Sequence, residues 1–164
     1  MIVIVMGVSG AGKTAIGSRL ADSFSWRFID ADEHHPPQNV AKMAGGTPLT
    51  DDDRWPWLEQ LNAMLREVQT RGESAVLACS ALREAYRRRL TEGLHAPRIV
   101  FLHGDQALIA ARLAQRKHHY MPASLLASQF ATLEPPADAL SIVVSGTPES
   151  CVDAVARGLG LFRA

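Results

Sequence analysis

The sequence predicts an α/β domain of three layers, α/β/α, in which the middle layer is a five-stranded parallel sheet. Two observations indicate this fold: short apolar runs rich in β-formers alternate with longer helical stretches, and a glycine-rich loop joins the first run to the first helix. The expected strands are residues 2–5, 27–29, 74–79, 98–103 and 140–145. The expected helices are residues 13–24, 52–71, 83–91, 106–115 and 148–159.

Length and composition predict one domain covering residues 1–164. The 17 basic and 17 acidic residues give a formal net charge of zero, so bulk charge does not indicate a nucleic-acid partner. No apolar run approaches the roughly 20 residues of a membrane span, and a strand that begins at residue 2 leaves no room for a signal peptide. Cys79 and Cys151 lie in apolar contexts, which indicates reduced core thiols and a cytoplasmic location.

The loop after the first expected strand carries the strongest chemical signal. It matches the phosphate-binding pattern G-x-x-x-x-G-K-[ST], and its residues are Gly7, Val8, Ser9, Gly10, Ala11, Gly12, Lys13 and Thr14. Backbone amides and a helix N-terminus form an anion site there. We expect Lys13 to reach the β- and γ-phosphates of ATP and the Thr14 hydroxyl to bind Mg²⁺. The fold is therefore expected to be that of the P-loop nucleoside triphosphate hydrolases.

Two carboxylates follow the second expected strand, at the sheet edge where ligands of such folds bind. Asp30 is the expected outer-shell ligand of Mg²⁺, and Asp32 is expected to orient an acceptor hydroxyl for phosphoryl transfer. The segment is expected to be extended, with the two side chains pointing to opposite sides, one toward the metal and the other toward the acceptor substrate. The two roles could be reversed, and Asp30 could instead cap the following turn. The guanine-binding pattern N-K-x-D is absent, which argues against a GTPase.

Several blocks of the chain resemble the gluconokinases. They lie at residues 30–36, 46–58, 78–83 and 128–135, in the order found in that family, and D-D-D-R-x-P-W-L and C-S-A-L are narrower signals than the phosphate loop. The resemblance implies ATP-dependent phosphorylation of D-gluconate at its 6-hydroxyl, giving 6-phospho-D-gluconate, by a cytoplasmic homodimer of sugar-acid breakdown. The alternatives are a shikimate-kinase-like or other small-molecule P-loop kinase, or a nucleotide-binding module without an acceptor.

Gluconate carries a carboxylate at one end, and arginine binds both oxygens of a carboxylate. The candidates are Arg54, Arg83 and Arg87, of which the last two would share one face of a helix. Arg54 could instead pair with the acids at 51–53, and Arg87 could belong to a solvated helix face. The other expected substrate contacts are Asp32, His35, Lys42 and Ser80.

A lid is expected at about residues 117–134, as in other small kinases that close over the triphosphate. Arg112 and Arg116 precede it, four residues apart, and resemble lid arginines that contact the nucleotide; a charged helix end is the alternative. Gln129 and Glu134 lie on the return leg of the lid, where the sequence indicates no role. The predicted catalytic set is Lys13, Asp32 and Arg116.

Overall fold

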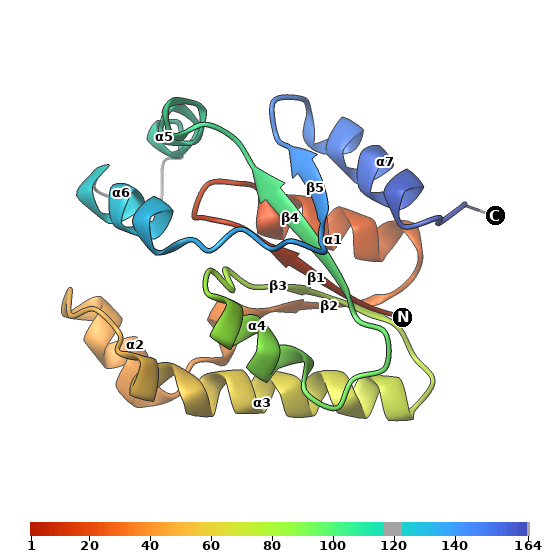
Figure 1. The fold of residues 1–164 in the computed structure, drawn as a ribbon, viewed down its shortest axis with the longest axis horizontal. Helices are drawn as coiled ribbons and strands as arrows, with labels where there is room; N and C mark the ends of the chain where they lie inside the picture. Colours follow the sequence, from red (N-terminus) through yellow and green to blue (C-terminus); the bar gives the residue numbers. More distant parts are fainter. Residues whose placement is uncertain (117–122, 164) are drawn as a thin grey trace.

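The computed structural model of the chain describes residues 1–116 and 123–163, and the ribbon of Figure 1 shows a sheet between two layers of helices. The five strands are parallel and lie in the order β2-β3-β1-β4-β5. Their bounds are Ile2–Met6 (β1), Arg27–Asp30 (β2), Ala75–Ala78 (β3), Arg98–His103 (β4) and Leu140–Val143 (β5). The predicted fold class is confirmed.

The central strand β1 divides the core into two halves. Its five side chains are fully buried, and successive residues point to opposite faces of the sheet. Val3 and Val5 pack in a cluster with α1 (Lys13–Ser23), α5 (Gln106–Ala114) and α7 (Pro148–Gly158). Ile2, Ile4 and Met6 pack in the other cluster, with α3 (Asp51–Thr70) and α4 (Glu84–Thr91). Each face of the sheet is thereby covered by helices.

Three helical elements occur where none was predicted. The segment after β2 turns into a short 3₁₀ helix, η1 (Ala31–His34), which leads into α2 (Pro37–Ala44). The expectation of an extended segment carrying Asp30 and Asp32 is wrong, because the carboxylate of Asp30 accepts the Asp32 N–H at 3.1 Å and starts the turn. The third is α6 (Ala123–Thr132), within the segment predicted as a lid.

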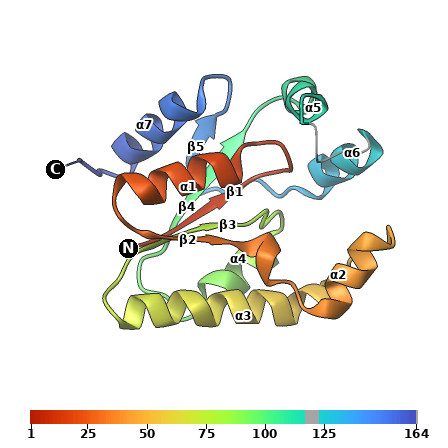
Figure 2. The same cartoon turned by 180° about the vertical axis from the view of Figure 1, so that it is seen from behind.

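The carboxyl ends of the strands point toward the side of the molecule where α2 and α6 lie, and both views place these helices at that side (Figures 1 and 2). The loop between β1 and α1 opens toward the same edge, which is where parallel α/β sheets bind ligands. Among the described helices none is both long and apolar enough to cross a bilayer.

Candidate active site

The loop between β1 and α1 depends on glycine at two positions. Gly10 has a φ of +84°, and a Cβ atom there would lie 2.7 Å from Cγ of Leu113. Gly12 has a φ of +94° and immediately precedes the first residue of α1. Both conformations disfavour other residues, so the sequence folds this segment into a tight wrap that ends on a helix N-terminus.

Lys13 lies at the centre of this loop. Its Nζ donates a hydrogen bond to the carbonyl of Val8 at 3.0 Å. Burial lowers the pKa of Lys13, the negative charge of Asp32 opposes that shift, and the positive charge of Arg116 adds to it. Asp32 and Arg116, the other two residues predicted as catalytic, therefore both lie within electrostatic range of Lys13.

Thr14 and Asp30 form the pair of oxygen groups predicted for a metal. The Thr14 hydroxyl donates to one carboxylate oxygen of Asp30 at 3.1 Å, while the other oxygen accepts the amide of Asp32. Asp30 thus caps the following turn, one of the interpretations drawn from the sequence, and also faces Thr14; its role as a metal ligand stays a prediction. A hydroxyl beside a carboxylate suits Mg²⁺, which prefers oxygen ligands and keeps several waters.

A cavity of about 610 Å³ opens beside the loop. The predicted site residues that line it are Ser9, Lys13, Asp32, His35, Arg54 and Ser80. They come from the ends of three neighbouring strands and from the start of α3. The walls also contain residues that sequence reasoning did not select, namely Met43, Pro48, Trp57, Tyr86, Leu125 and Gln129. Polar groups and apolar faces thus alternate around a space adequate for a small polyol.

Arg54 and Lys42 differ in their relation to this cavity. Arg54 lines it, while its Nη1 donates to the carbonyl of Leu49 at 2.8 Å and lies 3.8 Å from Asp51. Lys42 is not among the lining residues, because its Nζ is bonded to both carboxylate oxygens of Asp53 at 2.9 and 2.8 Å. Asp53 also closes the capping box of α3, so Lys42 supports the helix start in this structure.

Arg83 and Arg87, predicted to share a helix face toward the substrate, both reach Glu134 and are held by protein groups in this structure. Arg83 precedes α4 with extended backbone and pairs with Asp51 at 2.9 Å. Arg87 is 6% exposed, and its guanidinium donates to the carbonyls of Ala81, Leu82 and Glu134 at 2.8–3.1 Å. Neither arginine lines the cavity beside the phosphate loop. The spacing of the two arginines along the helix predicts that they lie on one face, but it cannot show that backbone carbonyls occupy the space in front of Arg87.

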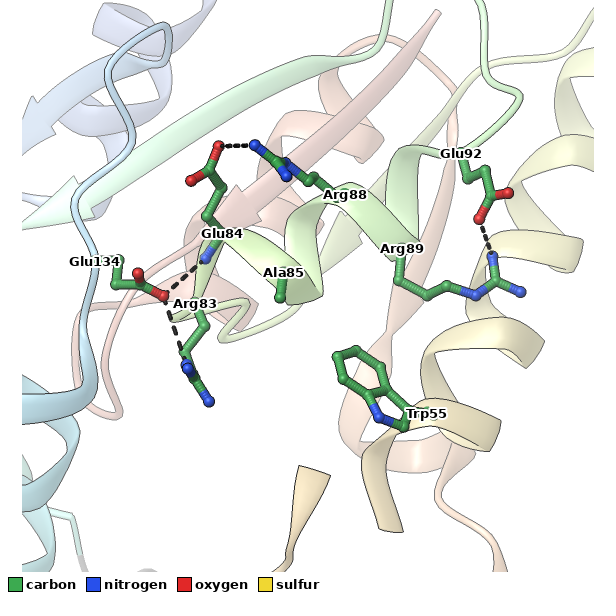
Figure 3. Close-up of a pocket in the computed structure, with 8 residues that line it drawn as sticks. All are labelled: Trp55, Arg83, Glu84, Ala85, Arg88, Arg89, Glu92 and Glu134. Atoms are coloured by element: carbon green, nitrogen blue, oxygen red, sulfur yellow. Dashed lines mark hydrogen bonds and ion pairs between the residues drawn. The ribbon is translucent and has the colours of Figure 1, made fainter. Parts of the chain in front are cut away.

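A second cavity, of about 700 Å³, lies against α4 and is shown in Figure 3. Its arginines are paired with acids: Arg83 with Glu134, Arg88 with Glu84, and Arg89 with Glu92. No residue of the phosphate loop lines this cavity. Because the phosphate loop lines the first cavity and not this one, we place the candidate active site in the first cavity.

Gln129 contacts the phosphate loop, a role that the sequence did not indicate. From α6, its Oε1 accepts the amide of Ser9 at 2.7 Å, and its Nε2 donates to the Ser9 hydroxyl at 3.2 Å. These bonds join residues 120 positions apart, so no local pattern predicts them. They connect the second half of the predicted lid to the phosphate loop. The first third of that lid, residues 117–122, falls outside the described residues.

The two arginines predicted to contact the nucleotide lie at the end of α5. Arg112 donates to the carbonyl of Gly146, in the loop after β5, at 3.2 Å. Arg116 is exposed, just beyond the helix, and its positive charge contributes to the lowered pKa of Lys13. Their contacts with a nucleotide stay a prediction.

Comparison with known proteins assigns the family. A family model described as an AAA domain matches residues 2–136. A gluconokinase of Gluconobacter oxydans (strain 621H) is 50% identical over 147 residues, which cover 88% of this chain and 82% of that protein. The crystal structure of a gluconokinase from Sinorhizobium meliloti 1021 has a TM-score of 0.87 at 40% identity, covering 96% of this chain and 90% of that one. The chain belongs to the gluconokinase family.

A further structural relative of the chain is an unliganded sugar kinase from Janibacter sp. HTCC2649. It has a TM-score of 0.88 at 42% identity and covers 98% of this chain and 94% of that one. The resemblance read from the blocks at residues 30–36, 46–58, 78–83 and 128–135 is thus confirmed at the level of the family. In the structure of this chain those blocks supply Asp32, His35, Arg54, Ser80 and Gln129 to a single cavity.

Proposed function

We propose that the chain transfers the γ-phosphoryl group of ATP to the 6-hydroxyl of D-gluconate, giving 6-phospho-D-gluconate and ADP. The observation that carries the proposal is the cavity in which the phosphate-loop lysine, Asp32 and polar groups suited to a polyol converge, in a chain of the gluconokinase family. The groups that would bind phosphate and those that would bind an acceptor line one space, as transfer between two substrates requires.

In the proposed reaction the loop at residues 7–14 cradles the triphosphate, and Lys13 neutralises charge on the β- and γ-phosphates. The carboxylate of Asp32 orients the 6-hydroxyl and accepts its proton as the new oxygen–phosphorus bond forms. The bond between the γ-phosphorus and the β-bridging oxygen breaks, and that oxygen leaves with ADP. Arg116 stabilises the transferring group when it reaches the γ-phosphate.

Thr14 and Asp30 are the residues that would hold Mg²⁺, directly or through water. When bound, the ion would offset charge on the β- and γ-phosphate oxygens. The observed pairing of the Thr14 hydroxyl with the Asp30 carboxylate supports this assignment. Their fit is chemical: both groups present the hard oxygen ligands that Mg²⁺ selects.

For the acceptor, Arg54 is the proposed partner of the gluconate carboxylate, with His35 and Ser80 as hydroxyl contacts. All three line the cavity, whereas Arg83 and Arg87 do not. We further propose that residues 1–164 act as one domain, that the segment at about 117–134 serves as a lid, and that the enzyme is a cytoplasmic homodimer without nucleic-acid or membrane partners.

The test is an assay of ADP release with MgATP and a panel of D-gluconate, shikimate, glucose, AMP and no acceptor. We expect a rate that depends on gluconate, with 6-phospho-D-gluconate as the product. A rate stimulated by another acceptor and not by gluconate would refute the proposal. Asp32→Asn should lower turnover by at least about a hundredfold while circular dichroism shows an unchanged fold. An Asp32→Asn enzyme with near wild-type turnover would contradict the role given to this carboxylate.

A further inference from the structure

His35 lies in the candidate active site with its ring held in one plane. Its imidazole stacks on the indole of Trp57, with ring centroids 4.0 Å apart and planes inclined by 16°. Trp57 is itself fixed, since it is 5% exposed and its Nε1–H donates to the carbonyl of Ala31 at 2.8 Å. The imidazole therefore presents a defined edge to the cavity that it lines with Asp32 and Arg54.

Asn39 contacts the other edge of this ring. Asn39 belongs to α2, is 0% exposed, and its Nδ2 donates to the backbone carbonyl of Asp53 at 2.9 Å. A carbonyl oxygen can only accept, so this bond determines which end of the amide is nitrogen. The same Nδ2 lies 3.3 Å from Nδ1 of His35.

The amide nitrogen determines the protonation of the ring. An amide NH₂ group donates and does not accept, so Nδ1 of His35 has to present its lone pair. The proton of the neutral ring then resides on Nε2. Within the described residues no hydrogen bond is made by Nε2, which leaves that N–H available to a ligand of the cavity.

The charged surroundings agree with a neutral ring. Burial lowers the pKa of His35, Asp32 opposes that shift, and Arg54 adds to it. An imidazolium would also place an Nδ1–H against the NH₂ group of Asn39, so that two donors would face each other.

The other end of the Asn39 amide, its carbonyl oxygen Oδ1, is in an unfavourable environment. Among the described residues its buried Oδ1 has no hydrogen-bond partner, a situation that is rare and unfavourable in protein interiors. The two bonds made by Nδ2, one to α3 and one to His35, are the interactions that offset it.

We propose that Asn39 is a positioning residue that holds His35 as the Nε2–H tautomer, so that the ring donates a hydrogen bond to a hydroxyl oxygen of the acceptor. This inference rests on the proposed function, because it needs a polyol in the cavity. It makes recognition directional: a hydroxyl can accept from Nε2–H, whereas an analogue without that hydroxyl leaves the donor unpaired.

The first measurement is two-bond ¹H–¹⁵N correlation NMR of the histidine rings in the full-length protein, with His35 assigned from the spectrum of His35→Gln. We expect a protonated Nε2 and an unprotonated Nδ1 at neutral pH. In Asn39→Asp the carboxylate accepts rather than donates, so Nδ1 should become protonated. The matched control is Gln38→Ala, an exposed neighbour on α2, which should leave the ring unchanged. A wild-type ring protonated on Nδ1 would overturn the proposal, whether or not the variant folds.

Kinetics supply the second measurement. We expect Asn39→Asp to raise the KM for gluconate about tenfold, the effect of one lost hydrogen bond, while the KM for ATP stays unchanged. A merely structural role of Asn39 would lower stability without moving the ring proton. A moved proton with an unaltered KM for gluconate would also overturn the proposal. Absence of gluconate turnover in the wild type would refute the proposed function, whereas the wrong tautomer in an active enzyme would refute only the positioning of His35.

Discussion

Replacing Arg87 by alanine tests whether this residue binds substrate, as its position in the sequence predicts, or supports the fold. Its buried guanidinium donates three hydrogen bonds to backbone carbonyls, two in the segment before α4 and one at Glu134. A hydrogen bond from a charged donor contributes about 1.5–3 kcal/mol, and water can replace part of it in the variant. We therefore expect Arg87→Ala to lower the free energy of unfolding by about 3–4 kcal/mol.

For a domain of this size, such a loss corresponds to a fall in Tm of roughly 6–16 °C. Differential scanning calorimetry measures it, and Arg88→Ala is the matched control. Arg88 is the next residue of α4, and among the described residues its exposed side chain pairs with Glu84, so that variant should shift Tm by about 1–2 °C. If Arg87→Ala melted like Arg88→Ala but bound gluconate much more weakly, the structural role would be refuted and carboxylate recognition restored.

Three further predictions concern the loop, the helix above it and the start of α3. Gly10→Ala places a methyl group 2.7 Å from the Leu113 side chain at a φ of +84°. It should lower the free energy of unfolding by about 1–3 kcal/mol and weaken ATP binding. An unchanged Tm together with an unchanged KM for ATP would contradict this prediction. Gln129→Glu keeps an acceptor for the Ser9 amide but adds negative charge beside the phosphate loop. The KM for MgATP should therefore rise several-fold, and the rise should be smaller at high salt. A rise in KM that does not depend on salt would argue against the electrostatic cause. The hydrogen bond from Lys42 is the main cause that lowers the folded-state pKa of Asp53 to about 2, so the stabilising contribution of this carboxylate is present above about pH 4 and lost as pH falls toward 2. The Tm difference between wild type and Asp53→Asn should therefore shrink over that range. A constant Tm difference would contradict this prediction.

The sheet could be predicted because its signals are local. Each strand has four to six residues and contains apolar residues, and the five predicted runs match the five strands of the structure to within two residues at each end. Helix α2 escaped prediction because it has only eight residues and begins at Pro37, and its apolar residues Val40 and Met43 are exposed rather than packed in a buried stripe. The turn at η1 escaped for another reason: it is made by a side chain, the Asp30 carboxylate, which accepts the amide two residues later.

The candidate site divides in the same way. The phosphate-binding half is contiguous, so one motif identified residues 7–14 and the chemistry they serve. The acceptor half is assembled by tertiary contacts. The bond from Asn39 to Asp53 and the stacking of His35 on Trp57 join segments 14 and 22 positions apart, and Gln129 reaches Ser9 across 120. Composition cannot show that Arg87 faces carbonyls or that Lys42 faces Asp53.

This division has a consequence for how the enzyme can distinguish its substrates. The phosphate loop relies on backbone groups and one lysine, which recognise a triphosphate and little else. Recognition of the acceptor has to come from side chains whose orientation is set by other side chains: Trp57 fixes the plane of His35, Asn39 fixes its proton, and the N–H of Trp57 is fixed in turn by Ala31. Because Ala31 lies between Asp30 and Asp32, the carboxylate proposed to hold Mg²⁺ and the carboxylate proposed to orient the acceptor belong to one continuous turn. A change that loosens the packing of Trp57 on this turn should therefore disturb gluconate recognition and phosphoryl transfer together, although the indole lies on the acceptor side alone.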